Sequence, residues 1–284
     1  MDVDFQRLRT WWDAKADRED KDTGDEAINR ALRWREIERN IEGVESVLDI
    51  GAGTGAFSIP LAQRGYAVTH LDISGRMLRA AQQRARGLRN ISFVEGNAVD
   101  LSRFADASFD LVLNMDGAIS FCGPRAEQAI LESSRVCGRK LIVTVSNRAR
   151  LATVLVSGSL NTAGRFLPAI GPMMDHGEWH QEQFAENVIL ARGVTQGYFP
   201  PTKAFLPSEL RSMLEKAGMR VLRVGGLGSL SNLCGPSTVA KVLSDAGLLG
   251  QFLDLCERFD KEIMPEGPGT TERAGLIATA ERRS

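Results

Sequence analysis

The stretch Val47-Leu48-Asp49-Ile50-Gly51-Ala52-Gly53-Thr54-Gly55-Ala56 joins a short apolar run to a turn in which three glycines alternate with small residues. Glycine has no Cβ and adopts positive φ at little cost, so the backbone of such a turn can lie close to a ligand. A helix that follows the turn offers its N-terminal amides to negative charge. The pattern therefore predicts a strand, a ligand-binding turn and a helix, in this order.

Short apolar runs alternate with helix-compatible segments on both sides of the turn. We expect strands at Ser46–Ile50, Ala67–Leu71, Ile91–Val94, Phe109–Leu113, Leu141–Val145, Met219–Val224 and Ala274–Ala280. Helices are expected at Phe57–Arg64, Met77–Arg86, Ala126–Val136, with a stop near Gly138, and from Ser208 to Gly218. Strands separated by helices need crossover connections. The fold class is therefore α/β: a doubly wound, Rossmann-like and mostly parallel sheet with helices on both faces.

Composition excludes several classes of protein. The 284 residues carry 35 Lys and Arg against 36 Asp and Glu, a net charge of −1, which argues against a nucleic-acid partner. The first fifteen residues have no apolar stretch of signal-peptide length, and no window approaches the ~20 apolar residues of a membrane span. The four cysteines form no C-x-x-C pair, which suits free thiols. We expect a cytoplasmic protein with no membrane partner.

The glycine turn has two interpretations. Gly51, Gly53 and Ala56 satisfy the G-x-G-x-x-G/A fingerprint of dinucleotide binding, and Asp72 follows at about the expected 20 residues. An NAD-dependent oxidoreductase is therefore one candidate. Asp49 argues against it, because a carboxylate there would repel a pyrophosphate but could bind the ammonium of an amino-acid moiety. The absence of a Tyr-x-x-x-Lys pair points the same way.

With Gly55 included the pattern becomes D-x-G-x-G-x-G, which resembles the first motif of class I S-adenosylmethionine-dependent methyltransferases. Further segments resemble motifs of this family and follow one another in the family's order. They are His70–Ser74, Val94–Ala98, Ser108–Asn114 and the segment from Phe205 to Met219. The resemblance covers roughly 46–147 and 205–224. It implies seven strands with the last antiparallel, S-adenosyl-L-methionine as methyl donor and S-adenosyl-L-homocysteine as product.

The resemblance also implies roles for single residues. Asp72 would hold both ribose hydroxyls, and Ile73 and Met77 would contact the adenine. Asn97, where many members have Asp, would accept from the adenine amino group. The full set implied for the donor is Asp49, Gly51, Ala52, Gly53, Gly55, Asp72, Ile73, Met77, Asn97, Ala98, Asn114 and Met115.

Outside the resemblance, two inserts and an N-terminal extension are expected to cover the site. Residues 1–45 form a helical segment over the donor, beginning at Trp11 and Trp12, unless these tryptophans only anchor the first helix. Residues 46–284 form the methyltransferase domain, with cap insertions at 147–207 and 225–271. The second insertion contains an expected helix from 238 to 258.

Three side chains are candidates for catalysis. His176 or His180 could act as a general base, because imidazole titrates near neutral pH. Both could equally be solvated, and H-x-x-x-H alone is a weak metal signal, so no metal is expected. Asp116, after the fourth strand, could orient a substrate amine or hydroxyl, or simply cap a turn. Trp12, Trp179 and Tyr198 are the residues expected to bind the acceptor.

The sequence thus predicts a methyltransferase that acts on oxygen or nitrogen of a small molecule in natural-product biosynthesis. The alternatives are the NAD enzyme, a cofactor-binding regulator without turnover, and a tRNA-modifying methyltransferase using the arginines between Arg76 and Arg89. Those arginines are also explained as one solvated helix face. The oligomeric state stays open.

Overall fold

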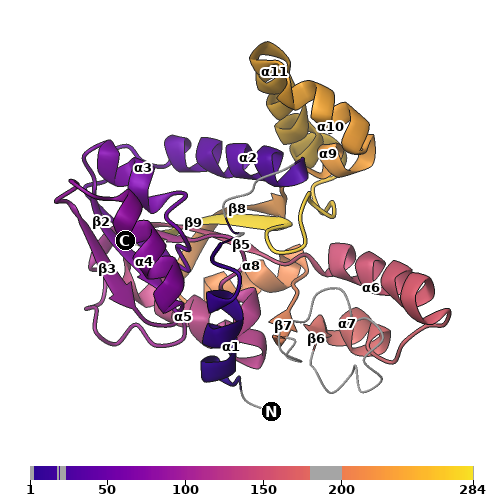
Figure 1. Ribbon diagram of the computed structural model, residues 1–284, viewed down its shortest axis with the longest axis horizontal. Helices are drawn as coiled ribbons and strands as arrows, with labels where there is room; N and C mark the ends of the chain where they lie inside the picture. Colours follow the sequence, from indigo (N-terminus) through magenta and orange to yellow (C-terminus); the bar gives the residue numbers. More distant parts are fainter. Residues whose placement is uncertain (1–2, 18, 20–23, 180–199, 284) are drawn as a thin grey trace.

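The structure is a computed structural model that describes residues 3–17, 19, 24–179 and 200–283. Seven strands form one sheet in the order β3-β2-β1-β4-β5-β9-β8 (Figure 1). Their bounds are β1 Ser46–Ile50, β2 Ala67–Asp72, β3 Ile91–Glu95, β4 Phe109–Asn114, β5 Cys137–Val145, β8 Met219–Gly226 and β9 Leu276–Arg282. β1 runs parallel to β2 and β4, whereas β9 runs antiparallel to β5 and β8. The predicted doubly wound sheet with an antiparallel last strand is confirmed.

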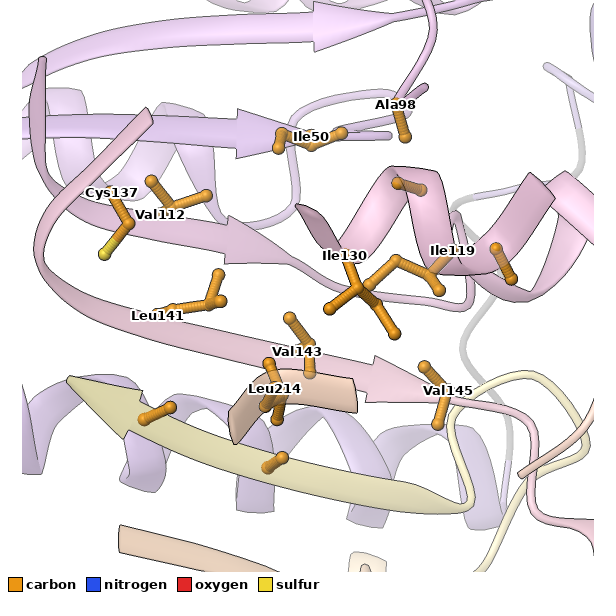
Figure 2. Close-up of a cluster of buried hydrophobic side chains, with 14 of the residues drawn as sticks. Ile50, Ala98, Val112, Ile119, Ile130, Cys137, Leu141, Val143, Val145 and Leu214 are labelled. Atoms are coloured by element: carbon orange, nitrogen blue, oxygen red, sulfur yellow. The ribbon is translucent and has the colours of Figure 1, made fainter. Parts of the chain in front are cut away.

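Alternate side chains of the central strands enter different cores, as the pleat of a strand requires. Leu48 and Ile50 of β1 join the cluster shown in Figure 2, whereas Val47 joins the cluster on the opposite face. The first face is covered by α5 (Ala126–Val136) and α8 (Pro207–Lys216). The second is covered by α2 (Asp25–Arg39) and α3 (Ser58–Gln63), with α4 (Gly75–Arg84) beside α3. Both faces of the sheet are therefore buried.

The start of β5 differs from the expectation. The helix α5 spans Ala126–Val136 as expected, but β5 begins at Cys137, whereas the expected strand begins at Leu141. A Cβ on Gly138 would lie 3.0 Å from the carbonyl oxygen of Ala107 and 3.1 Å from that of Phe109. This glycine therefore permits a close backbone approach within the sheet.

The remaining elements lie outside the central sheet. They are α1 (Phe5–Asp13) before it, and α6 (Arg148–Ala163), α7 (Ile170–His176), β6 (Glu178–Trp179) and β7 (Thr202–Lys203) in the first insertion. The second insertion contains α9 (Ser229–Cys234), α10 (Pro236–Leu243), α11 (Ala246–Arg258) and η4 (Phe259–Ile263). A short helix η1 (Ser120–Arg125) follows β4. In Figure 1, α9–α11 project beyond the end of α2, and α6 and α7 lie on the other side of the sheet.

The prediction of a single helix over 238–258 is wrong, because the chain forms two helices there. α10 ends at Leu243, and α11 begins after Asp245, whose carboxylate accepts from the N–H groups of Gly247 and Leu248 at 2.8 and 3.0 Å. An aspartate in extended backbone is a favoured N-cap. The apolar spacing continues across this break, which explains why periodicity alone missed it.

The Asp245→Ala variant is expected to lose about 1 kcal/mol of unfolding free energy, because two amides of α11 lose their acceptor. Urea unfolding followed by circular dichroism measures this loss. The matched control is Ser244→Ala, whose hydroxyl donates only to the carbonyl of Lys241 on an exposed turn. Equal losses in the two variants would contradict the capping role of Asp245.

Candidate functional site

A cavity of about 900 Å³ opens at the carboxyl ends of β1, β2 and β4, where ligands of doubly wound sheets bind. Segments from both ends of the chain form its wall. The wall residues are Phe5, Leu8, Trp12, Glu19, Arg30, Asp49, Ile50, Gly51, Ala52, Gly53, Thr54, Ala56, Phe57, Leu71, Asp72, Ile73, Met77, Gly96, Asn97, Ala98, Met115, Asp116, Ala118, Phe121, Cys122 and Arg273.

The glycine turn forms the floor of this cavity. Gly51 has φ 68°, and a Cβ there would lie 2.5 Å from the Cβ of Ala118, so only glycine fits. Gly53 has φ 56°, and its N–H donates to Asp72 Oδ2 at 2.8 Å. The turn is therefore held against β2 with its backbone exposed to the cavity.

Asp72 ends β2 at the centre of the wall. Its other oxygen, Oδ1, accepts from the N–H of Ser74 at 2.8 Å. Burial raises the pKa of Asp72 to about 6, although the N–H groups of Ser74 and Gly53 act to lower it. Each oxygen keeps a second lone pair, so the carboxylate can still accept from two adjacent hydroxyl groups.

Asp49 is almost fully buried, with 1% of its surface exposed. Burial raises its pKa to about 7; Ser58 and Arg33 lower it, while Asp72 raises it further. Among the residues that the structure describes, none makes a hydrogen bond of normal geometry to either oxygen of Asp49. A buried carboxylate without partners is costly, and an ammonium group in the cavity would satisfy it.

The remaining residues of the expected donor set are distributed around this centre. Ile73, Met77, Asn97, Ala98 and Met115 line the cavity. The Oδ1 of Asn97 also accepts from the N–H of Val99 at 3.0 Å. Two members of the set, Gly55 and Asn114, are absent from the described wall of the cavity.

Helix α1 covers the cavity beside Asp72. The carboxylate of Asp13, at the end of α1, accepts from the hydroxyl of Ser74 at 2.6 Å and from the N–H of Arg76 at 3.0 Å. Arg9 forms an ion pair of 2.7 Å with Glu95 at the end of β3. Trp12 packs edge-to-face on Phe121 with ring centroids 5.2 Å apart. This helix therefore contributes the apolar side chains of Phe5, Leu8 and Trp12 to the wall of the cavity.

Asp116 lies in the wall with a φ of 61°, in the left-handed region that few residues other than glycine adopt. Its N–H donates to Thr144 Oγ1 at 2.9 Å. Its Oδ1 lies 3.7 Å from Arg33 and 3.8 Å from Arg273. Burial acts to raise its pKa, but the arginines outweigh burial and hold the pKa of Asp116 below its usual value. A carboxylate held ionised in this way is a poor proton acceptor.

The other candidates for acceptor chemistry lie elsewhere. His176 is exposed at the end of α7, and Trp179 packs with Leu151, Leu155 and Met173; neither is among the described residues of the cavity wall. His180 and Tyr198 lie outside the described residues. The described part of the chain contains no group of three or more His, Cys, Asp or Glu side chains that could hold a metal. It also contains no helix long and apolar enough to cross a membrane.

Sequence reasoning missed a charged part of the wall. Arg273, just before β9, pairs with Glu19 at 2.7 Å and with Glu26 at 3.6 Å, and it stands over the ring of Trp12. No local sequence pattern predicts contacts between residues that are about 250 positions apart. Arg33 is different, because it falls on the core-facing stripe of α2 next to Leu32 and before Ile37. A charged residue among the apolar positions of a helix is a pattern in the sequence that could have identified Arg33 as a buried charge.

A family model described as a methyltransferase domain matches residues 47–139. The demethylmenaquinone methyltransferase of Tropheryma whipplei is 46% identical over 83 residues, which are 28% of this chain and 34% of that protein. That of Renibacterium salmoninarum is 36% identical over 122 residues, 41% of this chain and 49% of that protein. The chain thus spans between a third and a half of these relatives.

Among solved structures, magnesium protoporphyrin IX methyltransferase from Synechocystis with bound S-adenosylhomocysteine superposes with a TM-score of 0.56 at 18% identity, covering 99% of this chain and 100% of that one. A methyltransferase from Methanosarcina mazei gives 0.55 at 20%, covering 87% and 96%. The [4+2]-cyclase SpnF gives 0.52 at 19%, covering 89% and 81%. At these identities the likeness concerns the fold. Residues 47–139 thus match a methyltransferase domain by sequence, and the chain as a whole has the fold of S-adenosylmethionine-dependent methyltransferases.

Proposed function

We propose that the protein binds S-adenosylmethionine in this cavity and transfers its methyl group to an oxygen or nitrogen of a small-molecule acceptor. The observation that carries the proposal is the pair of buried carboxylates, Asp49 and Asp72, on one wall beside the glycine turn. The first accepts no hydrogen bond of normal geometry from the described residues, and the second has lone pairs left for a diol. An amino acid joined to a ribose fits this pair.

The donor supplies an activated methyl group: the acceptor's lone pair forms the new bond to carbon as the carbon–sulfur bond breaks, and sulfur keeps that electron pair. The residues of this chain therefore have two tasks: to position the donor and the acceptor, and to exclude water from them. Asp49 would hold the ammonium and Asp72 the ribose, while Ile73, Met77 and Asn97 would enclose the adenine.

The acceptor space is proposed next to Trp12, Phe121 and Asp116. Aromatic surface there suits an apolar, drug-sized molecule, as in natural-product biosynthesis. Because the arginines lower the pKa of Asp116, we assign it an orienting role toward a hydroxyl or amine, with its negative charge retained. The acceptor's proton, where there is one, would leave to solvent or to a base outside the described wall.

Two alternatives make contrary predictions. A dinucleotide would bring its pyrophosphate toward Asp49, which the buried carboxylate disfavours. A tRNA would need free basic surface, whereas Arg76 is paired with Asp17 and the arginine side chain of Arg84 donates to the Thr54 carbonyl. The fold of the [4+2]-cyclase SpnF also resembles this chain, so donor binding alone does not establish methyl transfer.

Calorimetry with S-adenosylmethionine, S-adenosylhomocysteine and NADH tests the cofactor. We expect both sulfur compounds to bind and NADH not to bind; the opposite result would refute the proposal. Transfer is tested by incubating the protein with methyl-labelled donor and small-molecule extracts of its source, and following the label by mass spectrometry. Donor binding with no labelled product from any extract would favour the cofactor-binding regulator.

A further inference from the structure

Arg273 carries hydrogen-bond donors that no described residue uses. Its Nη1 donates to Glu19 Oε1 at 2.7 Å. Its Nε lies 3.8 Å from Asp116 and its Nη2 lies 3.6 Å from Glu26, and both distances are too long for hydrogen bonds. The three guanidinium nitrogens of Arg33 are buried, whereas Nε and Nη2 of Arg273 are accessible, and 27% of its side chain is exposed. Because Arg273 lines the cavity, these N–H groups are available to a ligand.

Asp116 offers an acceptor beside these donors. Its Oδ1 is the oxygen that lies toward Arg33 and Arg273, and this oxygen is buried. The side chain still has 20% of its surface exposed, so Oδ2 is the oxygen that can reach the cavity. Left-handed backbone in a residue other than glycine, as at Asp116, is found preferentially at functional sites. The wall therefore holds an open donor and an open acceptor side by side.

Aromatic rings flank this pair. The guanidinium carbon of Arg273 lies 5.8 Å from the ring centroid of Trp12. Trp12 packs edge-to-face on Phe121, and both rings line the cavity. A flat apolar surface next to one donor and one acceptor fits an aromatic ring that carries a single polar group.

The charges around the pair select this polar group. Glu19, Glu26 and Asp116 surround the guanidinium of Arg273, so a carboxylate on the ligand would meet three negative charges. Arg33 and Arg273 flank Asp116, so an ammonium group would meet two positive charges. A neutral hydroxyl group can donate to Asp116 and accept from Arg273 at the same time.

The need for a nucleophile narrows this hydroxyl group to a phenol. The arginines hold the pKa of Asp116 below its usual value, so its carboxylate is a weak base. The described wall contains no histidine, lysine or tyrosine. The acceptor must therefore supply an oxygen that ionises readily. A phenol has a pKa of about 10, far below the value of about 16 for water, and N–H groups directed at its oxygen lower it further.

We propose that Arg273 and Asp116 form the acceptor subsite and bind a phenolic hydroxyl group there. The inference rests on the proposed methyl transfer and names its substrate class. The hydroxyl donates to Oδ2 of Asp116 and accepts from Nε or Nη2 of Arg273. Its proton leaves to solvent, the phenolate oxygen forms the bond to the methyl carbon, and the carbon–sulfur bond breaks with its electron pair on sulfur. Arg273 stabilises the negative charge on oxygen until the new bond forms.

The probe para-nitrophenol tests the inference, because its phenolate absorbs visible light and its neutral form does not. It is titrated with base while bound to the complex of the full chain with S-adenosylhomocysteine. We expect Arg273→Met to raise the pKa of the bound probe by about one unit and to weaken binding of the phenolate about tenfold. Asp116→Asn removes a negative charge and should lower the pKa of the bound probe. Asparagine tolerates left-handed backbone, so this variant keeps the turn. The other charged groups around the pair stay the same in both variants: Glu19, Glu26, Arg30 and Arg33.

Opposite shifts in these two variants are the signature of the subsite. Arg35→Met is the matched control, because Arg35 pairs with Asp254 on α11 at 2.6 Å and is not part of the described wall; it should leave the pKa of the bound probe unchanged. The anion para-nitrobenzoate and the neutral amine para-nitroaniline should bind more weakly than para-nitrophenol.

Three results would overturn the inference. They are an unchanged pKa of the bound probe in a variant that still binds S-adenosylhomocysteine, no binding of para-nitrophenol to the complex, and tighter binding of the benzoate or the aniline. If Arg273→Met no longer binds S-adenosylhomocysteine, Asp116→Asn decides alone. If the wild type itself binds no S-adenosylhomocysteine, the proposed function fails instead.

Discussion

The Asp49→Asn variant is expected to melt at a higher temperature than the wild type at pH 8 and to bind S-adenosylmethionine about 100-fold more weakly. The weaker binding follows from the loss of charged hydrogen bonds to the ammonium, each worth about 1.5–3 kcal/mol. The higher stability follows from removing a buried negative charge that Ser58 approaches but that accepts no hydrogen bond of normal geometry from the described residues. Both effects are measured on one protein preparation, by calorimetry and by thermal unfolding.

The stability effect has a defined pH dependence. The pKa of Asp49 is raised from 3.8 to about 7 in the folded protein, so the folded state binds a proton that the unfolded chain has released. This contribution is complete below about pH 4 and is lost as the pH rises through 7. At about 1.4 kcal/mol per unit, it amounts to roughly 4 kcal/mol. The difference in melting temperature between the variant and the wild type should therefore grow from pH 5 to pH 8; parallel pH curves would contradict it.

Asp110→Asn is the matched control, and its stability change has the opposite sign. Asp110 lies at the amino end of β4, and its carboxylate accepts from the N–H groups of Glu45 and Ser46 and from the Ser46 hydroxyl. Burial acts to raise the pKa of Asp110, but these donors outweigh it and lower the pKa. Its replacement should reduce stability at pH 8 and leave donor affinity unchanged.

The Asp72→Ala variant is expected to lose at least about 100-fold in donor affinity, because both ribose hydroxyls lose a charged acceptor. It should also lose stability, since the N–H groups of Gly53 and Ser74 are left without their acceptor. Calorimetry with S-adenosylhomocysteine measures the first effect without turnover. Asp110→Ala shares the structural loss but lies away from the cavity, so it should bind normally. Equal affinity losses in both variants would show that Asp72 acts only through the fold.

The central sheet could be predicted because its information is local. β1 runs from Ser46 to Ile50 as expected, and α5 begins at Ala126 as expected. Apolar runs, glycine turns and helix periodicity each act within about ten residues. Where two local signals conflict, the prediction fails: Asp245 caps a new helix inside a continuous apolar pattern.

Of the cavity wall, only the part formed by the glycine turn and the neighbouring strand ends could be predicted from the sequence. Asp49, Asp72 and Asn97 lie at or just beyond the carboxyl ends of neighbouring parallel strands, so their common location follows from a parallel sheet. Arg273 and Phe121 reach the same cavity from segments whose packing has no sequence signature. Trp179 shows the converse: an aromatic residue beside two histidines suggested a binding pocket, yet it belongs to the apolar cluster between α6 and α7.

The position of β9 between β5 and β8 also has a consequence for how the chain assembles during synthesis. The final strand described is an interior strand, and β8 reaches the rest of the sheet through it. On a ribosome, β8 has therefore no sheet to join until residues beyond Leu276 have emerged. Long-range pairing of this kind is slow compared with helix formation. Because Arg273 directly precedes this strand, closure of the sheet and completion of the cavity wall are expected to coincide.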